Sequence, residues 1–132
     1  MGGLSLLIDT HVLLWWWGEP KRLSARAKAL LRDPANRVLV SAASAWEIST
    51  KHRIGKLPGA QVIMDAWRER LAEDGFEELP IRGEHALRAG TLPGPHRDPF
   101  DRMLVAQSLL ESLPLLSSDR ALSGLGAHRI WR

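Results

Sequence analysis

The stretch "LSLLIDTH", residues 4–11, ends an apolar run abruptly at the carboxylate of Asp9. A short, continuous apolar run predicts a strand that is buried on both faces, as in parallel sheets covered by helices on each side. An ionised carboxylate next to such a strand is costly unless another group pairs with it. We therefore expect Asp9 either to cap the helix that follows or to bind a metal ion.

The rest of the chain repeats this alternation of buried strand and helix. Further strands are expected at 37–41, 76–81, 113–118 and 128–132. Helices are expected at 10–17, 23–33, 42–54, 60–74, 83–92 and 100–112, with a short helical turn at 119–126. Strands that alternate with helices predict an α/β sandwich with a mostly parallel central sheet. We expect one domain over residues 1–132.

The composition excludes several kinds of site and several classes of protein. The 132 residues contain no cysteine, which excludes disulfides, thiolate zinc sites and cysteine nucleophiles. The sequence has neither an apolar run of about 20 residues nor a signal peptide, so we expect a soluble, cytoplasmic protein with no membrane partner. The net charge of +3 and the pI of 9.9 are compatible with a polyanionic partner.

Carboxylates from four segments are expected at one edge of the sheet. In a parallel sheet the ligand crevice lies beyond the carboxyl ends of the strands. Asp9 and Asp119 directly follow predicted strands, Glu47 lies in the helix after the second strand, and Asp98 and Asp101 begin the helix that leads back to the sheet. Like charges at such proximity cannot all stay ionised without a counter-charge, so either one carboxyl pKa rises or a cation binds, and a site of oxygen ligands alone suits Mg²⁺ or Mn²⁺.

Each acid also has a purely structural explanation. Asp9 and Asp119 stand where helix N-caps are expected, and aspartate is a favoured N-cap. The segments "SAWE", 44–47, and "DPFD", 98–101, have the pattern of capping boxes, with the serine of the first and the first aspartate of the second as caps. The glutamate of "SAWE" could also pair with Lys51 one turn later. What favours a metal site is that all these acids fall at the same end of the strands.

The histidines show no metal-binding spacing such as HExxH. They are His11, His52, His85, His96 and His128. We expect most of them to be surface or partly packed residues. His96, two residues before Asp98, is the one expected at the rim of the site.

Four ordered blocks, "LLIDTHVLLWW", "VSAASAWEISTKHRIGKL", "HRDPFDRMLVAQS" and "LLSSDRAL", each contain one of these acids. Together they resemble the PIN-domain nucleases, in particular the VapC-type toxins of bacterial toxin–antitoxin pairs. The resemblance implies a three-layer α/β/α sandwich and an endoribonuclease that leaves 5′-phosphate and 3′-hydroxyl ends. It also implies three partners, which are an RNA substrate, a VapB-like antitoxin and a second copy in a homodimer.

The resemblance also assigns roles to residues. It implies that Mg²⁺ or Mn²⁺ is held by Asp9, Glu47, Asp101 and Asp119. Asp98 is either a fifth ligand or only a helix cap. By the same resemblance, the hydroxyls of Thr10 and Ser117 help to position water or metal.

Basic residues near the acids are expected to form an electrostatic track for the RNA backbone. They are Lys51, Arg53, Lys56, Arg97, Arg102 and Arg120. Three consecutive tryptophans, 15–17, span an arc of about 200° around a helix, so at least one should be partly exposed. We expect part of this tryptophan segment to lie at the antitoxin or dimer interface.

Two other enzyme classes fit the first strand less well. Phosphatases with an aspartate nucleophile require a second aspartate where this chain has His11. Receiver domains require an acidic pair beside the first strand, and none is present. A catalytically silent PIN fold that binds RNA or protein remains the alternative to a nuclease.

Overall fold

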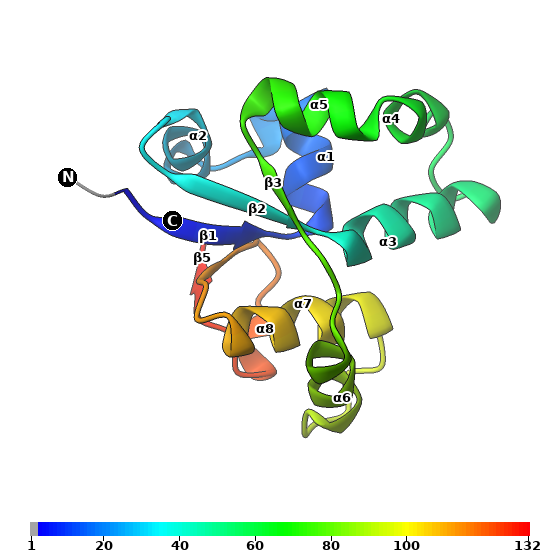
Figure 1. The fold of residues 1–132 in the computed structure, drawn as a ribbon, viewed down its shortest axis with the longest axis vertical. Helices are drawn as coiled ribbons and strands as arrows, with labels where there is room; N and C mark the ends of the chain where they lie inside the picture. Colours follow the sequence, from blue (N-terminus) through cyan, green and yellow to red (C-terminus); the bar gives the residue numbers. More distant parts are fainter. Residues whose placement is uncertain (1–2) are drawn as a thin grey trace.

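A parallel five-stranded sheet forms the middle layer of the computed structural model, which describes residues 3–132 (Figure 1). Its strands are β1 Ser5–Ile8, β2 Arg37–Ser41, β3 Glu77–Leu79, β4 Leu115–Leu116 and β5 Arg129–Ile130. Their order across the sheet is β3-β2-β1-β4-β5, and every neighbouring pair is parallel. The predicted α/β sandwich is therefore confirmed.

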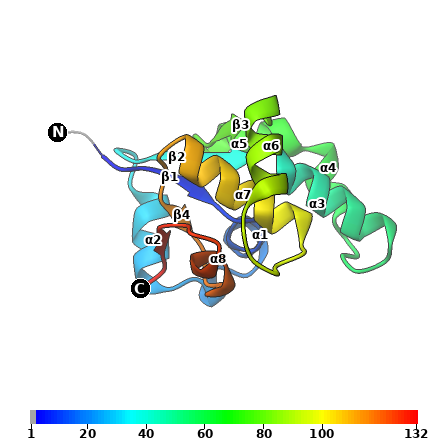
Figure 2. The same ribbon diagram turned by 90° about the horizontal axis from the view of Figure 1, so that it is seen from below.

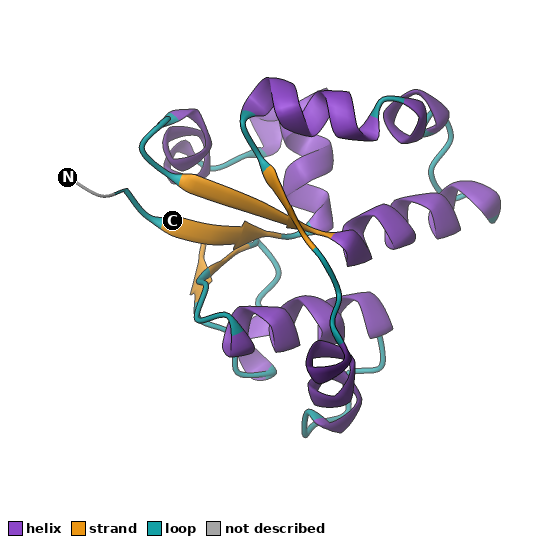
Figure 3. Cartoon of the chain, viewed as in Figure 1, coloured by secondary structure: helices purple, strands orange, loops and turns teal. Residues whose placement is uncertain are grey.

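Helices cover both faces of this sheet. They are α1 Thr10–Gly18, α2 Ala25–Arg32, α3 Ala42–Arg53, α4 Gln61–Asp65, α5 Trp67–Asp74, α6 Gly83–Thr91, α7 Pro99–Leu110 and α8 Ala121–Gly124, with a 3-10 turn at Pro20–Arg22. In Figure 1, α1, α2 and α5 lie above the sheet, and α6, α7 and α8 lie below it. Figure 3 shows the same layers by element type, and Figure 2 shows them from below. No helix within residues 3–132 has the length and apolar character needed to cross a bilayer.

The alternation of side chains along β1 explains why residues 6–8 of this strand are all apolar. Leu6 and Ile8 belong to the hydrophobic core under α1, α2 and α5, whereas Leu7 belongs to the core under α6 and α7. All three side chains are fully buried, whereas Ser5 at the start of the strand is only partly buried. The part of the strand covered on both faces has no position for a polar side chain, so the next polar residue comes where the strand ends.

The register of the strands brings three polar residues to one edge. Ile8 lies level with Val40 of β2 and Leu116 of β4. The next residues of the three strands are therefore Asp9, Ser41 and Ser117, side by side at the carboxyl ends. The Asp9 amide donates to the Leu116 carbonyl at 3.1 Å, which holds Asp9 beside β4.

Some elements differ from the sequence-based expectation. The helix expected at 60–74 is two helices that meet at Ala66, because the indole of Trp67 is held elsewhere. Its Nε1 donates to Glu78 at 2.8 Å, and its ring packs edge-on against Trp17. The expected strands at 76–81, 113–118 and 128–132 are shorter in the structure. The cap of α3 is Ser41 rather than Ser44, since this helix begins directly after β2.

Candidate metal centre

Asp9 lies between β1 and α1 and is 5% exposed. Its Oδ1 accepts the Val12 amide at 2.8 Å, so Asp9 is the N-cap of α1. Burial raises the pKa of Asp9 from 3.8 to about 6, and the negative charge of Asp101 adds to the rise, although hydrogen bonds from Ser117 and Val12 oppose it. The capping hydrogen bond thus does not offset the cost of burying the ionised Asp9 carboxylate, and a nearby cation would lower this cost.

Glu47 reaches the same edge from the second turn of α3. Only 3% of the residue is exposed. Its Oε2 accepts the Nζ of Lys51, one helical turn later, at 2.5 Å, which confirms the pairing that the sequence allowed. One turn before Glu47, the hydroxyl of Ser44 bonds that of Thr10 at 2.9 Å. This buried bond joins the start of α1 to α3 next to the two acids.

Asp101 stands in the first turn of α7, which Asp98 caps by accepting the amides of Phe100 and Asp101. The Asp101 carboxylate bonds the Nε2 of His96 at 2.9 Å, so His96 lies at the rim of the centre as expected. Burial raises the pKa of Asp101, the bond to His96 opposes the rise, and the charges of Asp98 and Glu47 add to it. Asp9, Glu47 and Asp101 are therefore close enough to act on one another electrostatically.

Asp119 follows β4 at the same edge but is exposed. Its Oδ1 accepts the Ala121 amide at 3.0 Å, and its own amide donates to the hydroxyl of Ser117 at 3.0 Å. Like Asp9, and unlike Glu47 and Asp101, Asp119 has no cationic or ionisable partner among the hydrogen bonds and salt bridges of residues 3–132. It thus stands at the rim, with its second oxygen not engaged by the chain.

These residues fit a hard divalent cation. The donors are all carboxylate oxygens, which suit Mg²⁺ or Mn²⁺. Two of the carboxylates, Glu47 and Asp101, already pair with a cationic or ionisable side chain of the protein, and the third, Asp9, carries a raised pKa. Carboxylates that lie close together create a negative potential, and this potential stabilises a bound cation.

A second group of ligand-type residues comprises Glu84 and His85 on α6 and Glu111 after α7. Each of these three residues offers one ligand atom, and the three atoms all lie within 4.8 Å of one another. However, the Nδ1 of His85 accepts the Arg82 amide at 3.0 Å, so its hydrogen must be on Nε2, which contacts Glu111 at 2.9 Å. That nitrogen then has no lone pair for a metal, and the group instead ties α6 to the end of α7.

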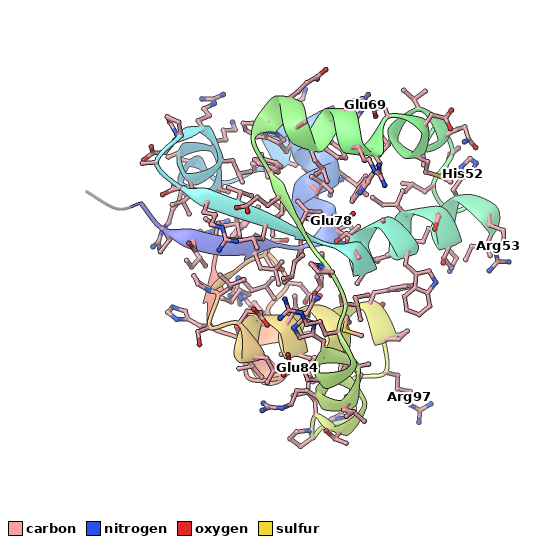
Figure 4. The ribbon with its side chains drawn as sticks, in the orientation of Figure 1. His52, Arg53, Glu69, Glu78, Glu84 and Arg97 are labelled. Atoms are coloured by element: carbon pink, nitrogen blue, oxygen red, sulfur yellow. The ribbon has the colours of Figure 1, made fainter. Side chains whose placement is uncertain are left out.

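The expected basic track is only partly available to a ligand. Lys51 and Lys56 line a cavity of about 220 Å³ beside Glu47. Arg53 and Arg97 are exposed, and Figure 4 shows both pointing outward on the same side of the molecule. Arg120 is also exposed.

Arg102, which was expected to contact RNA, is bound by the chain itself. Its guanidinium donates to the backbone carbonyls of Ala89, Leu92 and His96, with all of its donor nitrogens engaged. Arg102 therefore fastens the end of α6 and the following loop to α7. The end of α6 and the loop after it leave backbone carbonyls without helical partners, and the sequence does not indicate that Arg102 binds them.

Trp15, Trp16 and Trp17 on α1 are all half-buried. The sequence predicted that at least one of these three would be partly exposed. Trp16 and Trp17 both donate to the carboxylate of Asp74, and Trp15 packs against Trp131. The most exposed tryptophan is a different one, Trp46, at 53%. It was not singled out from the sequence, because its neighbours give no sign of which face of α3 it occupies.

The parallel α/β sandwich with carboxylates at its strand-exit edge places the chain in a known class of α/β domains. The chain belongs to the PIN domain family, whose model matches residues 6–127. It is 30% identical to Ribonuclease VapC22 of Mycobacterium tuberculosis over 119 residues, which are 89% of either chain. It is 37% identical to Ribonuclease VapC16 of the same organism over 68 residues, or 48% of each chain. The expected membership of the VapC-type group is confirmed.

Solved structures agree on the fold. The chain superposes on a chain of VapBC2 from Rickettsia felis, in the structure described as bound to a DNA fragment from their promoter, with a TM-score of 0.71. The match covers 98% of this chain and 100% of the other at 11% sequence identity. At that identity the similarity supports the fold only, and it confirms the expected PIN-type sandwich.

Proposed function

We propose that this protein is a metal-dependent endoribonuclease of the VapC type that hydrolyses RNA phosphodiester bonds. The observation that carries the proposal is the cluster of Asp9, Glu47 and Asp101, two of them almost fully buried, at the strand-exit edge of the sheet. Similarity to two ribonucleases over this fold supports the same reaction class.

The proposed metal ligands are Asp9, Glu47, Asp101 and Asp119, with Mg²⁺ or Mn²⁺ as the ion. When bound, such an ion activates water and stabilises the leaving oxygen of a phosphodiester. Asp98 acts as a cap, because its Oδ1 already accepts two amides of α7. As a cap, Asp98 fixes the start of α7 and thereby the position of Asp101.

The remaining polar residues position the centre. The bond between Thr10 and Ser44 fixes the spacing between α1 and α3, and so between Asp9 and Glu47. The hydroxyl of Ser117 bonds the Asp9 carboxylate and also receives the Asp119 amide. Removing the hydroxyl of Thr10 or that of Ser117 is expected to weaken metal binding rather than to abolish folding, because each hydroxyl acts through the ligand that it orients.

RNA, a VapB-like antitoxin and a second copy of the chain are the proposed partners, in the cytoplasm. We propose that Lys51, Lys56, Arg53, Arg97 and Arg120 contact the RNA backbone. The similar structure from Rickettsia felis is that of VapBC2 bound to DNA, which supports an antitoxin partner. The half-buried tryptophans of residues 15–17 are proposed to change environment when the antitoxin or the second copy binds, and an unchanged tryptophan fluorescence in both cases would refute this.

The test compares cleavage of a mixed pool of structured RNAs in Mg²⁺, Mn²⁺ and EDTA. Wild type is compared with Asp9→Asn, and with Asp65→Asn as a control that changes an exposed aspartate of α4. Metal-dependent cutting by wild type and the control, but not by Asp9→Asn, is the expected result. Cutting by Asp9→Asn at the wild-type rate would refute the assignment of the centre.

The alternative is a PIN fold that binds RNA or protein without cutting. It predicts no cleavage in any metal, together with no heat of Mn²⁺ binding that depends on Asp9. Calorimetric titration of wild type and Asp9→Asn with Mn²⁺ separates the two. A nuclease whose target is missing from the RNA pool still binds the metal at Asp9, whereas a silent module does not.

A further inference from the structure

A second basic surface lies beside β5, at the edge of the sheet. It consists of Arg22, Arg26, Arg120, Arg129, Arg132 and Trp131, and we refer to it as the arginine surface. These residues line two neighbouring hollows of about 550 and 410 Å³ that share Trp131 and Arg132. Neither hollow has an aspartate or glutamate among its lining residues. The surface thus concentrates positive charge far beyond what the net charge of +3 would suggest.

Within residues 3–132, few aspartate or glutamate side chains pair with these arginines. Arg129 bonds neutral acceptors, a serine hydroxyl and a backbone carbonyl, and Arg26 donates to the main-chain oxygen of Arg132. Arg22 lies 3.9 Å from Glu19, in a pair whose side chains are both more than half exposed. Exposed pairs of this kind contribute little and leave the arginine available to another anion.

Aromatic rings lie among these charges. Trp131 is half-buried and packs against Trp15, with ring centroids 6.0 Å apart. The guanidinium of Arg22 lies over Trp15, at 4.6 Å from the ring centroid. Arginines interleaved with indoles are the combination that binds single-stranded nucleic acid, because phosphates pair with arginine and unpaired bases stack on aromatic rings.

The arginine surface is continuous with the candidate metal centre. Ser118 and Arg120, on either side of Asp119, both line the second hollow. Arg129 donates to the carbonyl of Ser117, the residue whose hydroxyl bonds Asp9. A strand of RNA that passes the rim at Asp119 therefore meets Arg120 next and the rest of the surface beyond it.

We infer that the arginine surface binds a single-stranded segment of the RNA adjoining the cleaved bond, with phosphates on the arginines and an unpaired base on Trp131. The inference rests on the proposed function, since it takes RNA as the substrate. It adds a binding site on the β5 edge, and of the segments that form this site only the one between β4 and α8 also carries a proposed metal ligand, Asp119. It also makes the enzyme selective for an unpaired segment, because bases inside a duplex cannot stack on a protein ring.

The test uses two triple variants that remove the same charge. One changes Arg22, Arg120 and Arg132 to glutamine; none of these side chains donates a hydrogen bond within residues 3–132. The control changes three exposed arginines that do not line either hollow, Arg32, Arg68 and Arg88, to glutamine. Binding of a labelled single-stranded oligoribonucleotide of about 12 nucleotides is measured by anisotropy in EDTA, over a range of KCl concentrations.

The arginine-surface variant is expected to bind more weakly, with the slope of log K against log [KCl] reduced by about 2, since each lost phosphate contact on a single strand contributes about 0.7. The control should keep the wild-type slope. An abasic strand of the same length should bind wild type more weakly than the normal strand does. Equal slopes for the two variants, or stronger binding of the same sequence as a duplex, would overturn the inference.

Because binding is measured without metal, this result is independent of the cleavage assay. Loss of binding only in the arginine-surface variant, with no cleavage by wild type in any metal and no heat of Mn²⁺ binding that depends on Asp9, would refute the nuclease and leave the RNA-binding surface standing. Cleavage by wild type with equal binding by both variants would refute the surface and leave the nuclease standing.

Discussion

Replacing Asp9 by asparagine is expected to make the metal-free protein more stable at neutral pH. Burial raises the pKa of Asp9 from 3.8 to about 6. The folded state therefore holds this proton more tightly than the unfolded state, and the stability of wild type falls as pH rises from about 4 to about 6 and then stays low. The difference between the two pKa values corresponds to about 3 kcal/mol of destabilisation at pH 7.

Asparagine removes this cost without removing the helix cap. The Asp9 Oδ1 accepts the Val12 amide at 2.8 Å, and asparagine caps helices about as well as aspartate. The variant should thus gain on the order of 1–3 kcal/mol at pH 7, with a gain that vanishes near pH 4. Alanine at the same position has no capping oxygen, so Asp9→Ala should be less stable than Asp9→Asn by about 1 kcal/mol.

Urea unfolding in EDTA, followed by tryptophan fluorescence from about pH 4 to pH 8, measures these differences. Asp33→Asn is the matched control, since Asp33 is an exposed aspartate that also accepts a backbone amide, that of Ala35. It should show no pH-dependent gain. An Asp9→Asn protein that is less stable than wild type at pH 7 would refute the reasoning, because it would mean that the carboxylate stabilises the fold even without a metal.

Three further predictions follow from the same contacts. Lys51→Met should raise the affinity for Mn²⁺ measured by calorimetry, because Lys51 competes for Glu47 at 2.5 Å; a lower affinity would mean that Lys51 only orients the ligand. Mn²⁺ affinity should fall as pH drops from about 7 to about 5, since the pKa values of both Asp9 and Asp101 are raised, and a flat profile would contradict this. Arg102→Ala should lower stability by roughly 2–4 kcal/mol in thermal unfolding, and lysine should not rescue it, because three carbonyls lose a planar donor.

The sheet and the position of the acids were predictable because their signals are local. An apolar run such as 4–8 has only one stable placement, between two layers of helices, and the residue after it must stand at the strand-exit edge. The parallel register then carries Asp9 and Ser117 to the same level without any further information. Glu47 follows from helical spacing after β2, since Ser41 starts α3 and the glutamate comes in its second turn.

Other features depend on contacts between distant segments. The break at Ala66 comes from the anchoring of Trp67 to Glu78 and Trp17, and no proline or glycine marks it. Ser44 has the sequence pattern of a cap, but it lies inside α3 and bonds Thr10, 34 residues away. Whether a polar side chain caps, bonds a neighbour or faces a ligand is decided by what the fold brings next to it.

A carboxylate has two oxygens, so the two roles that the sequence left open for Asp9, helix cap and metal ligand, are compatible. One oxygen of Asp9 caps α1, and the residue nevertheless keeps a raised pKa, so the cap does not satisfy it. Asp33 also accepts an amide, yet it is exposed and water solvates the rest of its charge. Burial, rather than the capping bond, therefore distinguishes Asp9 from Asp33. In a parallel sheet, helices that start at the same edge bring such half-satisfied carboxylates together, which is why we place the proposed metal centre there.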